Sequence, residues 1–357
     1  MIRLRGLLAD TARCSLVLGA LWAGAATGQT GSVGQAAPAE TPPNQAASAS
    51  ISHARTLLQQ GNSDAAIAEL KGLEAGSNPP KGLSHELGVA YYKKGEYLRA
   101  IDYLKKAAME DPADLEGTQL TGLSYYLAGH PSDAIPYLEK VQTWFPRANV
   151  DAAYILGICY IQNKDYPHAR QAFAKMFDLA PDSASSYLLT ARMLLRQEFV
   201  PIAEEYGHKA IEIDPKLPLA HFLLGELYLF KSQIPEATSE LQKELEINPG
   251  YAPAYYKLAD AYSRVQKYDD AERLLQRSIW LDATATGPYI LMGKVLEKKG
   301  EWELAVRALQ RAINMDPGNA MPHQLLGQTY RDMGKTDEAE AELQKASKLR
   351  QAIDAKE

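Results

Sequence analysis

Residues 81–112 read KGLSHELGVAYYKKGEYLRAIDYLKKAAMEDP. Two small residues of this stretch, Gly88 and Ala100, recur 34 residues further on as Gly122 and Ala134. The tyrosines, leucines and the closing proline around them recur at the same interval. A fixed period of this length is the signature of a repeat architecture and not of an ordinary globular domain.

The period extends over nine copies, with Asn149 as one inserted residue. The copies are 47–80, 81–114, 115–148, 150–183, 184–217, 218–251, 252–285, 286–319 and 320–353. The eighth position is glycine or alanine in all nine copies, and the twentieth is alanine in all nine. Small side chains at fixed positions allow two helices to cross closely. Each copy is therefore predicted to hold two packed antiparallel helices.

The ends of the predicted helices carry matching signals. Proline closes six copies, and a proline cannot continue the second helix. Glycine occupies the turn at the fifteenth position of five copies, where a positive φ is often required. The middle four copies have Lys164, Glu198, Ser232 and Gln266 at that position instead. We interpret these four as a variant turn.

This pattern resembles the tetratricopeptide repeat family over residues 47–353. The resemblance implies an all-α fold, a right-handed α-solenoid of nine stacked helix-turn-helix repeats. Each copy of such an array buries its apolar face only against its neighbours. We therefore expect one continuous core without a domain boundary inside 47–353, followed by a short tail at 354–357.

The N-terminus has the features of an export signal. Basic residues come first, an apolar stretch from Cys14 to Ala26 follows, and small residues permit cleavage before Gln29. We predict a signal peptide at 1–28, a disordered tether at 29–46, and a periplasmic or secreted protein with no stable membrane insertion after cleavage. The alternative is an uncleaved N-terminal membrane anchor.

Composition and motifs argue against catalysis. The net charge is −6 and no basic stripe is present, so nucleic acid is not expected as a partner. The seven histidines are scattered without clustered cysteine or acidic partners, and no phosphate loop or nucleophile elbow occurs. We predict no enzyme activity, no metal, no cofactor and no small-molecule substrate. Cys159, within an apolar run, is interpreted as a small buried hydrophobe.

In the family that this pattern resembles, positions 2, 5, 9, 12 and 13 of each first helix line a concave groove. These positions share one helical face. The residues predicted to bind a partner there are Tyr92, Leu123, Tyr126, Tyr154, Ile158, Arg192, Arg196, Phe222, Phe230 and Tyr256. The alternative is that some of the apolar ones pack between neighbouring first helices.

The ninth positions contain no asparagine, so we do not expect a clamp for a terminal carboxylate. The expected ligand is an apolar helix or extended segment of a protein or peptide, with Arg192 and Arg196 holding an acidic group. The sequence thus favours a non-enzymatic scaffold or adaptor in the bacterial envelope. The alternative is a structural subunit of an envelope assembly for pilus formation, secretion or polysaccharide export.

Overall fold

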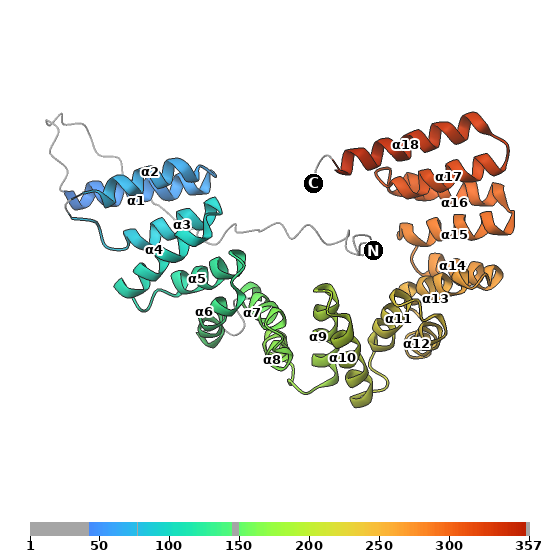
Figure 1. The fold of residues 1–357 in the computed structure, drawn as a ribbon, viewed down its shortest axis with the longest axis horizontal. Coiled ribbons are helices and arrows are strands. Elements are labelled where there is room, and N and C mark those ends of the chain that lie inside the picture. The colour runs from blue at the N-terminus through green and yellow to red at the C-terminus, as the bar shows by residue number, and fades with distance from the viewer. Residues whose placement is uncertain (1–42, 77, 145–149, 355–357) are drawn as a thin grey trace, which may run out of the picture. The chain divides into compact units, whose positions relative to one another are not determined.

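The computed structural model describes residues 43–76, 78–144 and 150–354. These residues form eighteen α-helices and, within those ranges, no strand (Figure 1). The predicted signal peptide and most of the predicted tether lie outside the described residues. The helices are α1 (Pro43–Gln59), α2 (Ser63–Glu74), α3 (Leu83–Lys94), α4 (Tyr97–Glu110), α5 (Leu115–Leu127), α6 (Pro131–Trp144), α7 (Val150–Gln162), α8 (Tyr166–Met176), α9 (Ala184–Arg196), α10 (Val200–Ile213), α11 (Ala220–Phe230), α12 (Ile234–Ile247), α13 (Ala252–Arg264), α14 (Tyr268–Leu281), α15 (Thr286–Lys299), α16 (Trp302–Met315), α17 (Ala320–Asp332) and α18 (Thr336–Asp354).

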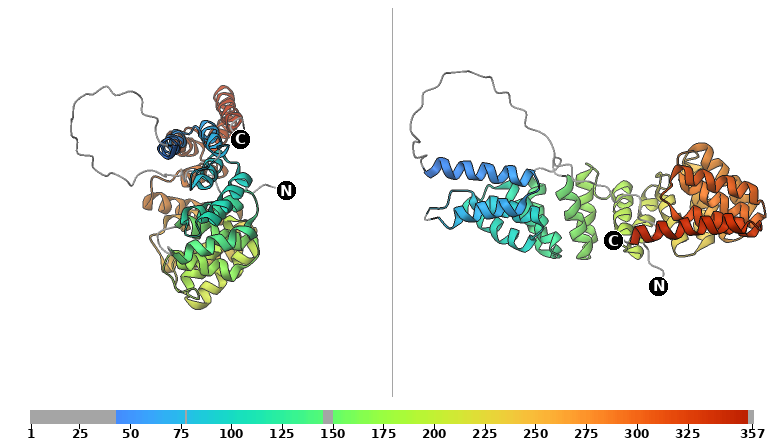
Figure 2. Two further views of the ribbon diagram at one scale, coloured as in Figure 1. Left: turned by 90° about the vertical axis from the view of Figure 1, so that its left-hand side faces the viewer. Right: turned by 90° about the horizontal axis from the view of Figure 1, so that it is seen from above.

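The helices pack in chain order, two per copy (Figures 1 and 2). Odd-numbered helices are the first helices of the copies and even-numbered helices are the second. First helices of neighbouring copies also contact each other, in the pairs α3–α5, α5–α7, α11–α13, α13–α15 and α15–α17. Among the described residues, no two second helices contact each other to the same extent. The predicted all-α solenoid is therefore confirmed, and its first helices form an inner layer.

The eighth-position glycines receive a large side chain from the second helix of the same copy. An ideal Cβ placed on Gly88 would lie 2.6 Å from Leu104, and one placed on Gly225 would lie 2.6 Å from Leu241. The twentieth-position alanines are buried nearby. The two backbones also approach closely at this crossing, since the same Cβ on Gly88 would lie 3.2 Å from the backbone nitrogen of Leu104. A bulky side chain fills the space that the missing Cβ leaves, so close packing is kept.

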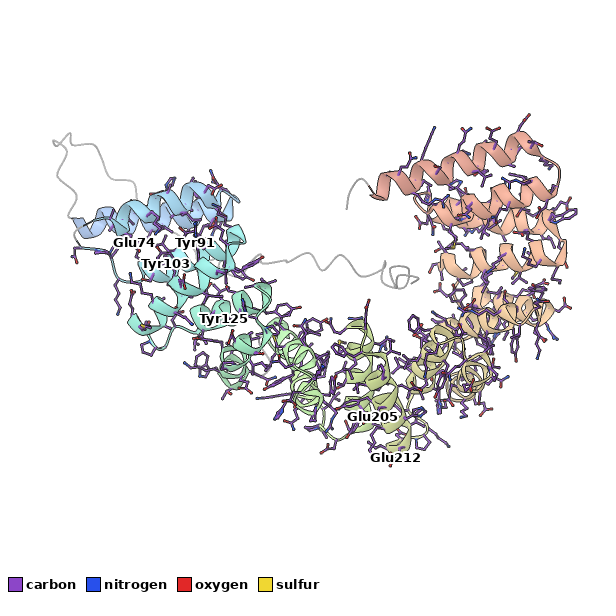
Figure 3. The ribbon with its side chains drawn as sticks, viewed as in Figure 1. Glu74, Tyr91, Tyr103, Tyr125, Glu205 and Glu212 are labelled. Atoms are coloured by element: carbon purple, nitrogen blue, oxygen red, sulfur yellow. The ribbon has the colours of Figure 1, made fainter. Side chains whose placement is uncertain are left out.

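The eleventh position fills the space between the two helices of a copy. Tyr91 stacks on Tyr103 with ring centroids 5.5 Å apart, and Tyr125 stacks on Tyr137 at 5.6 Å. Figure 3 labels Tyr91, Tyr103 and Tyr125 along the first copies. Offset stacking of this kind adds about 0.5–1.5 kcal/mol to the burial of the rings.

The turn between the two helices is the same in all nine copies, so the variant turn predicted for the middle copies is wrong. The glycines at this position have φ between 75° and 84°, and the four other residues have φ between 58° and 65°. The left-handed conformation is imposed by the packing of the two helices. Residues with a Cβ adopt it at a cost of about 1–2 kcal/mol each.

Helical structure begins within the predicted tether. Helix α1 begins at Pro43, so residues 43–46 of the predicted tether are helical. Proline is well suited to the first turn of a helix, and the alanines that follow favour the helical state. The described residues from Ala47 onward form one compact unit of the chain.

Helix α5 contributes no fully buried large apolar side chain to the core. Its Leu120 packs on the apolar cluster before it, and Leu123, Tyr125 and Tyr126 pack on the cluster after it. The buried residues of α5 are small or hydroxylated, namely Gly117, Thr118, Thr121, Gly122 and Ser124. Buried apolar clusters lie on either side, over residues 54–104 and 134–227. The hydroxyl of Thr121 donates to the carbonyl of Gly117 at 2.7 Å, which satisfies it inside its own helix.

The two loops on either side of α9 and α10 are anchored by buried polar groups of the fourth and the sixth copies. At the first, α8 ends early at Met176, and the Arg170 guanidinium donates to the Pro181 carbonyl and to Asp182. At the second, the fully buried carboxylate of Glu244 accepts hydrogen bonds from the amides of Leu219 at 3.0 Å and Phe222 at 3.3 Å. Burial of a charged group is tolerated because these hydrogen bonds compensate it.

Candidate functional site

The candidate site is the first-helix face, which we define as positions 2, 5, 9, 12 and 13 of the first helices. The ten residues predicted there fall into three classes of exposure. Arg192, Arg196 and Phe230 are exposed; Tyr92, Leu123, Tyr126, Tyr154 and Tyr256 are half-buried; Ile158 and Phe222 are buried. Eight of the ten are therefore at least partly accessible.

The two buried residues pack inside the array. Ile158 is 1 % exposed and belongs to the apolar cluster of residues 134–227. Phe222 packs edge-to-face against Tyr251, with ring centroids 5.0 Å apart. These two residues therefore pack between helices, as in the alternative given above, because neighbouring helices of the array cover their side chains.

A cluster of partly exposed apolar side chains spans α5 and α7, which are in direct contact. We call it the tyrosine patch and define it as Leu123, Tyr126, Leu127 and Tyr154. Leu127 is 45 % exposed. Burial raises the pKa of Tyr126, and the neighbouring Cys159 and Tyr154 raise it further. Tyr126 therefore keeps its proton, and both rings offer an apolar face with a hydroxyl at its edge.

Cys159 lies beneath this patch and is fully buried. Burial raises the pKa of its thiol to about 12. A thiol that stays protonated is a poor nucleophile and a poor metal ligand. The interpretation of Cys159 as a small buried hydrophobe is confirmed.

The first-helix face is polar and internally paired in the seventh and eighth copies. Arg264 bonds to Asp260 at 2.6 Å and to the carbonyl of Leu229 at 2.9 Å. Lys298 bonds to Glu297 at 3.1 Å. Most of the charges here already have partners on the same or a neighbouring first helix.

Paired charges also cover the first-helix face of the first two copies. Arg55 bonds to the buried Glu86, and His85 bonds to Asp114 at 2.6 Å. A shallow cavity of about 320 Å³ lies among Arg55, His85 and Glu86. The predicted site did not include these residues. The available signal was the position of His85 and Arg55 in their copies, the fifth and the ninth, whereas Glu86 at the sixth position gave none.

No group of three or more histidine, cysteine or acidic residues that could hold a metal ion occurs in the described part of the chain. Among its helices, none has the length and apolar content needed to cross a membrane.

Three sequence profiles, each described as tetratricopeptide repeat, match this chain. One matches residues 125–193 and 296–356, a second matches 240–273 and a third matches 51–114. The chain belongs to the tetratricopeptide repeat family. Members of this family are typically protein-interaction scaffolds without catalytic activity. A comparison with curated protein sequences found no match to this chain.

Solved structures of other repeat proteins are similar to this tetratricopeptide repeat protein. A crystal structure of MamA is 25 % identical, with coverage of 46 % of this chain and 96 % of MamA and a TM-score of 0.43. YrrB, described as having an unusual peptide-binding site, is 24 % identical, with coverage of 52 % and 98 % and a TM-score of 0.43. PilF of Pseudomonas aeruginosa is 19 % identical, with coverage of 58 % and 97 % and a TM-score of 0.46.

Proposed function

We propose that this protein is a non-enzymatic scaffold or adaptor that binds a protein or peptide partner on its first-helix face. The observation that carries the proposal is the tyrosine patch on α5 and α7. Exposed apolar surface next to rings with a polar edge is typical of partner sites in otherwise polar proteins. Elsewhere on the first-helix face, in the first, second, seventh and eighth copies, paired charges predominate.

The proposed ligand is an apolar helix or extended segment. An amphipathic helix can place one apolar stripe on a groove formed by other helices. Phe230 on α11 is 43 % exposed and offers a second apolar contact on the same face as the patch. A ligand that reaches from α5 to α11 would contact several copies at once.

The test is to change Tyr126 and Tyr154 singly to alanine and to measure partner retention and melting temperature together. Lost retention with unchanged melting supports the proposal, because half-buried rings at a binding face add little to folding. Phe222→Ala is the matched core control and should melt early, with a cost of about 3–5 kcal/mol. If both tyrosine variants melt as early as the control, these rings are core and the proposal fails.

The envelope setting is part of the same proposal and rests on the N-terminal sequence. The basic start, the short apolar stretch and the small residues before Gln29 favour export by a cleaved signal peptide. Intact mass of the protein from an envelope fraction tests it, and a mass that includes Met1 leaves only the membrane-anchor alternative. A stoichiometric complex from that fraction would favour the other function, a structural subunit of an envelope assembly.

A further inference from the structure

Helix α9 presents two arginines, Arg192 and Arg196, at positions 9 and 13 of the fifth copy. Residues four apart lie on the same side of a helix. Both side chains are exposed, and neither has a carboxylate within ion-pair distance in the part of the chain that the structure describes. Two like charges at this spacing repel each other and slightly destabilise the helix.

In the seventh copy the same two positions carry opposite charges, which form an ion pair. Asp260 and Arg264 occupy positions 9 and 13 there and bond at 2.6 Å. Arg264 also reaches the carbonyl of Leu229 on the preceding first helix, which contacts its own helix α13. Helix α9 makes no contact of that extent with α7 or with α11. Arg196 therefore has no such carbonyl to bond.

Nearby carboxylates are already bonded to other groups. Burial raises the pKa of Tyr251, and the charge of Arg192 lowers it while those of Glu226 and Glu244 raise it. All three charged groups therefore lie near the Tyr251 hydroxyl. Glu226 bonds to Lys257 at 2.9 Å, and Glu244 accepts from two backbone amides. Neither carboxylate forms an ion pair with Arg192 or Arg196 in the described part of the chain.

Apolar side chains lie on the same face as the arginine pair. Leu195 is half-buried next to Arg196 on α9, and Phe230 is exposed at position 13 of the next first helix, α11. A guanidinium is less strongly hydrated than an ammonium and can bond both oxygens of a carboxylate. A ligand that joins one carboxylate to apolar groups would match this surface.

We propose that Arg192 and Arg196 bind an acidic side chain of the partner, an aspartate or glutamate flanked by apolar residues. This inference rests on the proposed function and adds the chemistry of the ligand to it. A long polyanion is disfavoured because the chain carries a net charge of −6 and the two arginines are a local exception. The eighth copy also has two cations at these positions, Lys294 and Lys298, but Lys298 is bonded to Glu297.

The test is a selection from a library of short random peptides on three forms of the protein. These are the wild type, the double variant Arg192→Glu/Arg196→Glu, and the control Arg307→Glu/Arg311→Glu. The control arginines have the same spacing and are also exposed, but they lie on the second helix α16. The control variant changes the net charge of the protein by the same amount, but at a site away from the first-helix face.

The wild type and the control should select peptides enriched in aspartate or glutamate next to apolar residues. The double variant should lose that enrichment, and the wild-type peptides should bind it at least about tenfold more weakly. Their affinity for the wild type should also fall with rising salt concentration, because both arginines are exposed.

Three results would overturn the inference, and they have different consequences for the proposed function. Peptides selected without acidic enrichment, or equal losses in both double variants, refute the arginine site and leave the scaffold proposal standing. Binding of vesicles containing phosphatidylglycerol that depends on Arg192 and Arg196, without acidic enrichment among peptides, assigns the site to lipid headgroups instead. If no peptide is enriched on the wild type, both proposals fail.

Discussion

The fifth copy, α9–α10, and the seventh copy, α13–α14, follow the same 34-residue pattern but are held in place differently. The seventh copy has its first helix in contact with both neighbouring first helices, and its charges at positions 9 and 13 are paired. The fifth copy lacks contacts of that extent, and its two charges are left exposed. The loops on either side of it are anchored by Arg170 within the fourth copy and by Glu244 within the sixth.

This difference shows that the repeat pattern fixes the packing inside a copy more strictly than the packing between copies. The glycine–leucine contact and the left-handed turn recur across the array, whereas the junction between copies is made by whichever residues occur there. Polar junctions and uncompensated charge reduce local stability, and binding surfaces are commonly drawn from such regions.

The largest effect should come from the buried carboxylate that anchors the loop before α11. Glu244→Ala would leave the amides of Leu219 and Phe222 without their acceptor, and should lower the free energy of unfolding by about 2–4 kcal/mol. Hydrogen exchange should rise in the first turn of α11. Equilibrium denaturation and amide exchange measure both effects.

The equivalent position in the seventh copy supplies the control. Ser278 is buried there and donates to the carbonyl of Ala252 at 2.9 Å. Ser278→Ala removes one neutral hydrogen bond and should cost about 1 kcal/mol. Equal costs for the two variants would show that the junctions do not differ in the way described.

Glycine replacements at the eighth position should affect the copies next to these two regions, the fourth and the eighth, alike. The Cβ of Gly157→Ala would overlap the ring of Phe173, and that of Gly293→Ala would lie 2.5 Å from Leu309. Each variant should lose about 1–3 kcal/mol in urea denaturation. Gly72→Ala is the control, because nothing lies within 4 Å of its added Cβ, and it should be neutral or stabilising. A large loss in only one copy would mean that packing within copies is not shared.

The turns offer a prediction of opposite sign in the middle and C-terminal copies. Lys164→Gly and Gln266→Gly should each raise the melting temperature, with a gain of about 1 kcal/mol, since glycine adopts the left-handed conformation without strain. Gly300 also has a positive φ, so Gly300→Ala should lower the stability by about the amount that each glycine insertion adds. Thermal melts of all three test this, and a loss on either glycine insertion would contradict it.

The smallest effect should be a pH dependence in the sixth copy. His221 bonds to Glu240 at 2.6 Å, and that hydrogen bond raises the pKa of the buried imidazole. A raised pKa in the folded state stabilises the protein below the ordinary value of 6.5, and the gain is lost as the pH rises through the folded pKa. Lys243, which also bonds to Glu240, opposes part of the shift.

The measurement is unfolding free energy between about pH 6 and pH 8 for the wild type and for His221→Gln. The wild type should lose stability relative to the variant across this range. Identical slopes would show that the imidazole does not contribute. The same bond holds the pKa of Glu240 below its ordinary value, so that contribution is lost only in acid.

Several features of the site could be predicted from the sequence because they depend on periodicity alone. Arg192, Arg196 and Tyr126 were assigned to the first-helix face from their positions in the copy, and the structure leaves them exposed or half-buried. Ile158 and Phe222 occupy equivalent positions but are buried. Position in a helix sets the direction of a side chain, whereas the neighbouring copies decide whether it is covered.

The sequence by itself determined the helices, their pairing and the place of each copy, because a 34-residue period with small residues at two fixed positions has one close-packed solution. Only the tertiary structure decided the rest. It showed that Lys164, Glu198, Ser232 and Gln266 adopt the glycine conformation, that the fully buried residues of α5 are small or hydroxylated, and that α9 lacks the first-helix contacts made elsewhere. These features depend on contacts between residues far apart in the chain, and periodicity does not specify such contacts.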